Sequence, residues 1–229
     1  MTAHDLTAQD RSIFKPAVML MSGRAAGFIV TFFVPVVLAR VFTQEEFGTY
    51  KQLFLIAYTL FPFVQLCFAE CLFYFIPGRP ECSPKFVTNS ILMLAVAGTV
   101  CAAALIMYAQ AIAAWMNNPA IVDYMPIIGV YLVLIMMSTV LEITMLTRKR
   151  YAWATGTYAA SDVLRSLLLI IPAFLTRSLE WALIGGILFC VTRLIAAAAY
   201  LRAEFGTELG LDRGLLREQV IYSVPYSLD

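Results

Sequence analysis

Long apolar segments, separated by short polar ones, run along the whole of this 229-residue chain. There are six of them, at residues 13–41, 47–76, 84–112, 119–146, 158–175 and 181–201. Because an α-helix rises about 1.5 Å per residue, segments of this length suit a hydrocarbon core of about 30 Å. The pattern predicts an all-α, polytopic membrane protein with a lobe of six transmembrane helices.

Capping and turn signals mark where these helices begin and end. Thr43 and Glu46 have the spacing of a capping box, in which each side chain accepts from the backbone N–H of the other residue. The second segment ends at Pro-Gly, residues 77–78. Ser-Pro at 83–84 and Asn-Pro at 118–119 each combine an N-cap residue with a proline suited to the first helical position.

The composition of the sequence changes after residue 202. Residues 203–219 are polar and punctuated by glycine, which is typical of a linker between membrane bundles. Residues 220–229 turn apolar again but are too few to cross a membrane. We therefore expect an N-terminal lobe at 1–202, a cytoplasmic linker at 203–219 and, at 220–229, the start of a seventh transmembrane helix that belongs to a second lobe.

Composition agrees with a membrane protein. About 61% of the residues are hydrophobic and 14% are charged, against roughly 25% charged in soluble domains. Basic and acidic residues nearly balance, so nothing indicates a nucleic-acid partner. The positive-inside rule predicts that the N-terminus and linker are cytoplasmic, because only Arg40, Lys51 and Arg177 lie in the opposite loops. The basic residues of the predicted cytoplasmic side are Arg11, Lys15, Arg79, Lys85, Arg148, Lys149, Arg150, Arg202, Arg213 and Arg217.

Six charged residues fall inside or near the ends of the apolar segments. A charge at the bilayer centre costs about 2.5 to 3.5 kcal/mol on insertion scales, so these side chains should face the bundle interior, water or one another. They are the candidate functional residues. They are Arg24, Glu70, Glu142, Asp162, Arg165 and Arg193.

Each candidate also has a structural alternative. Asp162 and Arg165 are three residues apart on one helix face, so they form either a mutual ion pair or a substrate contact. Arg193 lies in the middle of its segment, where a cavity position and a packing position are both open. Arg24 has no acidic residue three or four positions away, which favours a water-filled, substrate-facing cavity.

Glu70 and Glu142 lie near segment ends that face the predicted cytoplasmic side. Their carboxylates are either solvated at the interface or serve an ion-pair or coupling role in a cavity. No catalytic motif accompanies them: nucleotide-binding loops and nucleophile elbows do not occur in the sequence. The five cysteines lack metal-ligand spacing and His4 is the single histidine, so we predict no metal, no cofactor and no enzyme activity.

Three stretches carry a resemblance to a known family. They are LARVFTQEEFGTYKQ at 38–52, FVQLCFAECLFYFIPG at 63–78 and, more weakly, REQVIYSVPYSLD at 217–229. The specific part is the acidic-Phe-Gly-x-Tyr core of the first stretch. In these residues the chain resembles the bacterial polysaccharide-biosynthesis flippases of the multidrug/oligosaccharidyl-lipid/polysaccharide exporter superfamily.

The resemblance implies a transporter of the bacterial inner membrane, built from two six-helix lobes around a cationic cavity. Such a protein moves polyprenyl-diphosphate-linked oligosaccharide, and Arg24, Arg165 and Arg193 would bind the diphosphate. This chain would supply the first lobe, with membrane lipids around it and a second lobe on the same or another chain. A multidrug or cation antiporter of the same superfamily is one alternative, and a membrane glycosyltransferase or ligase is another.

Overall fold

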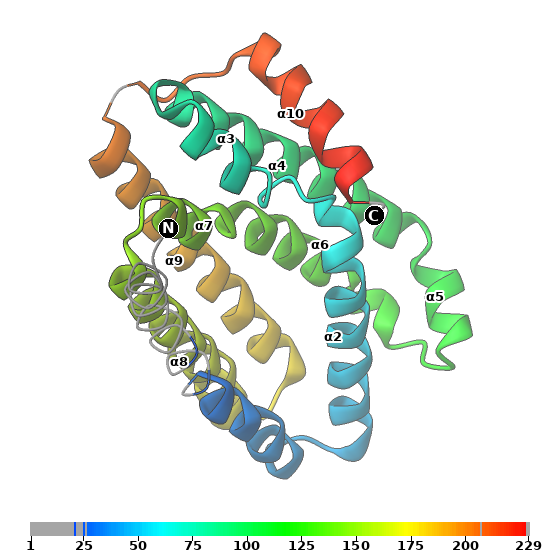
Figure 1. Cartoon of the computed structure of the whole chain (residues 1–229). Helices are drawn as coiled ribbons and strands as arrows, with labels where there is room; N and C mark the ends of the chain where they lie inside the picture. The colour runs from blue at the N-terminus through cyan, green and yellow to red at the C-terminus, as the bar shows by residue number, and fades with distance from the viewer. Residues whose placement is uncertain (1–20, 22–24, 26, 207, 228–229) are drawn as a thin grey trace, which may run out of the picture.

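Helices are the only regular elements in the part of the chain that the computed structural model describes, which is residues 21, 25, 27–206 and 208–227 (Figure 1). The all-α prediction is therefore confirmed. The elements are a first helix at Gly27–Val41, α2 (Gln44–Gln65), α3 (Leu72–Gly78), the 3₁₀ turn η1 (Pro80–Cys82), α4 (Ser83–Met107), α5 (Ala109–Trp115), α6 (Ile121–Ser138), α7 (Val140–Thr147), α8 (Tyr151–Thr176), α9 (Leu179–Phe205) and α10 (Arg213–Tyr226).

Four stretches of the described chain are long and apolar enough to cross a membrane: Pro80–Met107, Ile121–Thr147, Tyr151–Thr176 and Leu179–Phe205. The third and fourth correspond to the segments predicted at 158–175 and 181–201. The described part of the first helix is shorter, and α2 carries charges in its first two turns. The count of six spans and the cytoplasmic N-terminus remain predictions.

The capping box at the start of α2 is confirmed. The backbone N–H of Glu46 donates to Thr43 Oγ1 over 3.2 Å, and the backbone N–H of Thr43 donates to Glu46 Oε2 over 3.0 Å. Both donors would otherwise lack a helical partner. The reciprocal bonds fix where the chain turns from the first helix into α2.

The prediction of one continuous helix over 47–76 is wrong. α2 ends at Gln65, and Leu66 and Cys67 adopt positive φ angles of 46° and 54° before α3 begins at Leu72. A left-handed conformation is costly for residues with a side chain. Tertiary contacts must therefore hold it, and one of them is a hydrogen bond from Gln65 Nε2 to Glu70 Oε1 across the turn.

α6 is the central helix of the bundle and packs against α4, α9 and α2. One apolar cluster joins α2, α6, α8 and α9 through residues such as Leu53, Leu132 and Leu183. A second cluster, around Phe75 and Phe86, joins α3, α4 and α7 to the end of α9. The long helices are thus held at both ends of the bundle by separate apolar contacts.

α8 and α9 lie side by side (Figure 1), and their backbones approach closely at Gly185. A Cβ at this glycine would lie 1.8 Å from the backbone oxygen of Leu168 and 2.9 Å from its carbonyl carbon. Because these are backbone atoms, the two helices would have to separate. At the neighbouring Gly186, the nearest atom to a Cβ would be Leu169 Cδ2 at 3.6 Å, an ordinary contact.

We expect Gly185→Ala to lower the free energy of unfolding by about 1 to 3 kcal/mol, the usual cost of overpacking a tight contact. Gly186→Ala is the matched control and should cost much less. Thermal unfolding of both variants in detergent measures the difference. Equal midpoints would show that the α8–α9 contact is not as close as described.

Large apolar side chains cover much of the outside of the bundle. Phe28, Trp115, Phe174 and Leu175 are each more than 60% exposed. Soluble monomers seldom expose apolar patches of this extent. With the four spanning-length helices, this exterior is that of a membrane protein.

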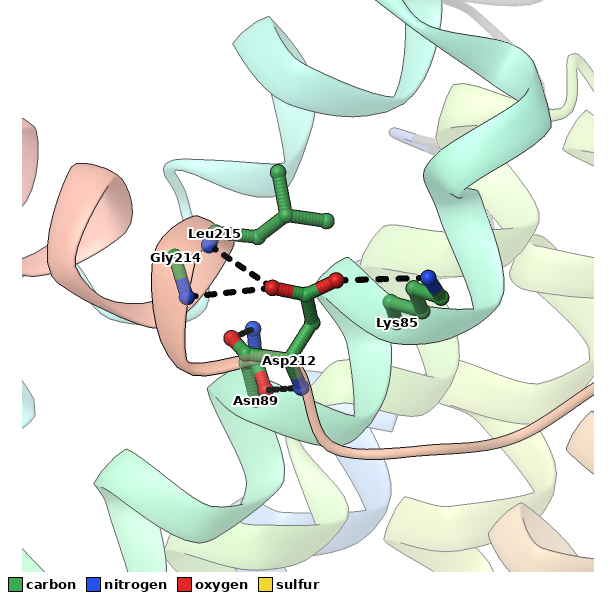
Figure 2. Close-up of polar contacts among 5 residues, drawn as sticks. All are labelled: Lys85, Asn89, Asp212, Gly214 and Leu215. Atoms are coloured by element: carbon green, nitrogen blue, oxygen red, sulfur yellow. Dashed lines mark hydrogen bonds and ion pairs between the residues drawn. The ribbon is translucent and has the colours of Figure 1, made fainter.

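α10 begins at Arg213, inside the segment that the sequence analysis placed in a linker. The cause is Asp212, whose Oδ1 accepts from the backbone N–H groups of Gly214 (3.0 Å) and Leu215 (3.3 Å) (Figure 2). A carboxylate at this position satisfies the first donors of a helix and interacts well with its dipole. The division into lobe, linker and second lobe remains a prediction.

Polar contacts attach α10 to α4, along which it runs in Figure 1. Lys85 Nζ lies 3.2 Å from Asp212 Oδ2, and the Asn89 side chain exchanges two hydrogen bonds with the backbone of Asp212 (Figure 2). Farther along, the fully buried Gln219 donates to the Phe86 carbonyl over 3.2 Å and to Ser90 Oγ over 3.1 Å. The segment after α9 is thus fastened to the first turns of α4.

The first turn of α10 should loosen at low pH. Bonds from the backbone N–H of Leu215 and from Lys85 lower the pKa of Asp212 below its ordinary value. The stabilisation is therefore complete above the unfolded-state pKa and is lost as pH falls through the lower folded-state pKa. Amide protection factors at Gly214 and Leu215, measured by hydrogen exchange, should fall over that range in the wild type. Asp212→Asn keeps an acceptor but cannot titrate, so its protection should be independent of pH; a parallel fall in that variant would contradict the assignment.

Candidate anion-binding cavity

Two adjoining cavities lie among the first helix, α2, α6, α8 and α9, and both are lined by Tyr58 and Arg165. The first measures about 300 Å³, and Thr31, Tyr50 and Lys51 also line it. The second measures about 240 Å³. Its other lining residues are Ala57, Phe61, Tyr131, Leu132, Ile135, Thr139 and Arg193. We call the two together the arginine cavity.

Among the described residues, every charged side chain that lines the arginine cavity is a cation: Lys51, Arg165 and Arg193. The remaining lining is apolar, apart from tyrosine and threonine hydroxyls. Cations in an apolar cavity interact with an anion more strongly than they would in water, because the dielectric screening is weaker. The lining suits a group that carries negative charge.

Arg165 is held in place by two neighbours. Its Nη2 lies 3.2 Å from Asp162 Oδ1, one turn earlier on α8, and donates to Thr31 Oγ1 of the first helix over 3.1 Å. The carboxylate of Asp162 packs against Gly27, where a Cβ would lie 2.1 Å from Asp162 Oδ2. A glycine at this position therefore gives Asp162 the room to turn toward Arg165.

Arg193 is held from another helix. Its Nη2 donates to Glu142 Oε2 of α7 over 2.6 Å, and the Glu142 side chain is only 2% exposed. The pair is joined at one point only: Glu142 Oε1 and Arg193 Nε are both buried with no hydrogen-bond partner among the described residues. Arg193 thus touches a carboxylate on one side and the cavity on the other.

The six predicted site residues fall into three groups. Arg165 and Arg193 line one cavity, and their partners Asp162 and Glu142 lie behind them, outside the lining. Glu70 lies apart, in the turn between α2 and α3, where it accepts from Gln65. Arg24 lies outside the described residues, so its position stays a prediction.

Sequence reasoning missed Lys51 and the tyrosines of the cavity. The pattern of basic residues places Lys51 in a loop, but Lys51 follows the capping box by less than two helical turns and belongs to α2. Tyr58 and Tyr131 lie well inside α2 and α6, whereas tyrosine in membrane helices usually concentrates near the helix ends. That unusual position is the signal that could have identified them.

No group of three or more His, Cys, Asp or Glu side chains in the described ranges is arranged to hold a metal ion. A family model described as polysaccharide biosynthesis protein matches residues 37–229. Neither a curated protein nor a solved structure matches the chain. The family match covers α2 to α10 and with them most of the arginine cavity.

Proposed function

Because the chain belongs to the family of polysaccharide biosynthesis proteins, we propose that it is a membrane transporter for polyprenyl-diphosphate-linked oligosaccharide. It moves this substrate from the cytoplasmic to the outer leaflet of the bacterial inner membrane by alternating access. The observation that carries the proposal is that all charged residues in the described lining of the cavity are cations. A diphosphate that is bare in hydrocarbon would cost many kcal/mol, and guanidinium groups remove that cost by charge-assisted, bidentate hydrogen bonds.

In this account Arg165 and Arg193 bind the diphosphate, and Lys51 lines the part of the cavity between the first helix and α2. The polyprenyl tail stays in the bilayer beside the apolar exterior. Arg24 is a third candidate ligand for the diphosphate. A second lobe, on the same or another chain, completes the cavity, because alternating access needs two bodies that move relative to each other.

The rival functions fit the cavity less well. A multidrug or cation antiporter needs carboxylates exposed to the cavity, but Glu70, Glu142 and Asp162 do not line it. A glycosyltransferase or ligase needs an acid or base that reaches its substrate, and the described lining contains no acidic residue and no histidine.

Deleting the gene in its host tests the proposal. Lipid-linked oligosaccharide should accumulate on the cytoplasmic leaflet, and the polymer made from it should disappear from the cell surface. Drug sensitivity is the counter-measurement: if the deletion sensitises cells to drugs and leaves the oligosaccharide distribution unchanged, the antiporter is the correct function.

The orientation has its own test. Ion pairs join Arg79 after α3, Lys85 in the first turn of α4 and Arg150 before α8 to acidic residues between 204 and 218. These basic residues therefore share one end of the bundle. Reporters fused after Arg150 and after Arg213 should report cytoplasm, because basic residues are retained on that side. A reporter fused after Asn117 should report the outer side. Reversed signals would invert the proposed direction of transport.

A further inference from the structure

The charges around the second cavity sum to zero. Arg165 and Arg193 line it, and each already contacts a carboxylate, Asp162 or Glu142. A diphosphate diester carries two negative charges, so its entry would leave the site strongly negative. Uncompensated buried charges cost several kcal/mol each. The incoming anion must therefore be accompanied by a cation, or one of the carboxylates must lose its charge.

Glu142 is the carboxylate best placed to lose its charge. Its side chain is 2% exposed, whereas that of Asp162 is 30% exposed and can be solvated. Its Oε1 has no hydrogen-bond partner among the described residues and is free to carry a proton. Arg193 contacts it through a single bond and already reaches the cavity, so Arg193 needs only a small movement to exchange Glu142 for a phosphate oxygen.

Few charged groups of the described chain lie around Glu142. Arg193 of α9 faces it, and Asp162 of α8 acts on it from farther away. α3 has no charged residue, the only one of α4 is Lys85 in its first turn, and the only one of α6 is Asp123 at the far end of that helix. The tyrosines that line the second cavity are Tyr58 and Tyr131.

We infer that Glu142 takes up one proton when the diphosphate headgroup binds, which releases Arg193 from its ion pair to hold the headgroup. This inference rests on the proposed function. It makes Glu142 the site where a proton is coupled to substrate binding. Linkage requires the converse as well: deprotonation of Glu142 recaptures Arg193 and weakens the hold on the substrate.

Calorimetry on the complete gene product, purified in lipid nanodiscs, tests the inference. The probe is a short-chain prenyl diphosphate monosaccharide, a diester whose charge stays constant near neutral pH. Titration in two buffers of different ionisation enthalpy gives the number of protons taken up.

We expect about one proton per headgroup for the wild type and about none for Glu142→Gln, which keeps the acceptor oxygen for Arg193 but cannot titrate. Glu70→Gln is the matched control, because Glu70 also has a buried oxygen without a partner but lies away from the cavity; it should still take up about one proton.

A second measurement needs no variant. The dissociation constant of the wild type should rise about tenfold per pH unit wherever Glu142 is ionised in the free protein. Binding without proton uptake, or uptake that persists in Glu142→Gln, would overturn the inference and leave the proposed function standing. Failure of the wild type to bind the probe at any pH would overturn both.

Discussion

Glu142→Met is expected to lower the free energy of unfolding by about 3 to 5 kcal/mol, because it leaves the largely buried Arg193 side chain, which is 14% exposed, without its carboxylate. Arginine cannot escape this cost by losing its proton. The double variant Glu142→Met/Arg193→Met removes both charges and should regain most of the lost stability. Apolar replacements for buried ion pairs are often neutral or stabilising.

Lys85→Met is the matched control for this comparison. Lys85 and Asp212 are 48% and 34% exposed, so breaking their ion pair should cost far less than breaking the pair of Glu142 and Arg193. Denaturant unfolding in detergent micelles gives all three values. If Glu142→Met loses as little stability as Lys85→Met, Arg193 is solvated. The cavity then does not have a low dielectric constant.

Arg165→Gln should reduce transport of lipid-linked oligosaccharide about 30-fold or more, since a hydrogen bond to a charged group contributes about 1.5 to 3 kcal/mol and the guanidinium offers two to a diphosphate. Arg165→Lys should recover only part of the activity, because an ammonium group cannot bind two phosphate oxygens in a planar fork. Cellular export and the amount of protein in the membrane should be measured together.

Arg177→Gln provides the control for Arg165. Arg177 ends α8 on the same helix and lies outside both cavities, so its replacement should leave transport unchanged. Normal export by Arg165→Gln, or a loss explained by degradation of the protein, would make Arg165 a structural partner of Asp162. The residue that binds the diphosphate would then have to be Arg193 or Arg24.

Local features of this fold could be read from the sequence because they depend on few residues. The capping box needs only Thr43 and Glu46, and both of its bonds are present. The break after α2 could not be read, because Leu66 and Cys67 give no glycine or proline signal at the residues that turn. The bond from Gln65 to Glu70 and packing around the turn hold it, and both depend on the folded bundle.

The candidate site divides in the same way. The cost of charge in a membrane identifies Arg193 and Glu142 as interior residues, but not as partners, because they are 51 residues apart and meet only through the packing of α7 on α9. The pair Asp162–Arg165 was foreseeable, since it lies within one helical turn. Tertiary packing determines which side of each helix faces the cavity. For this reason the sequence alone does not show that Lys51 and Tyr58 line the same cavity as the arginines.

Translocation in reconstituted vesicles tests the central claim most directly. The protein is placed in liposomes with a fluorescent lipid-linked oligosaccharide, and a membrane-impermeant quencher reports how much of it reaches the opposite leaflet. With the complete gene product, we predict rapid exchange between leaflets that is lost in Arg165→Gln/Arg193→Gln and retained in Arg177→Gln. Exchange at the protein-free rate, or exchange that the double variant leaves unchanged, would contradict the proposal that this family member carries a diphosphate-linked glycan through its arginine cavity.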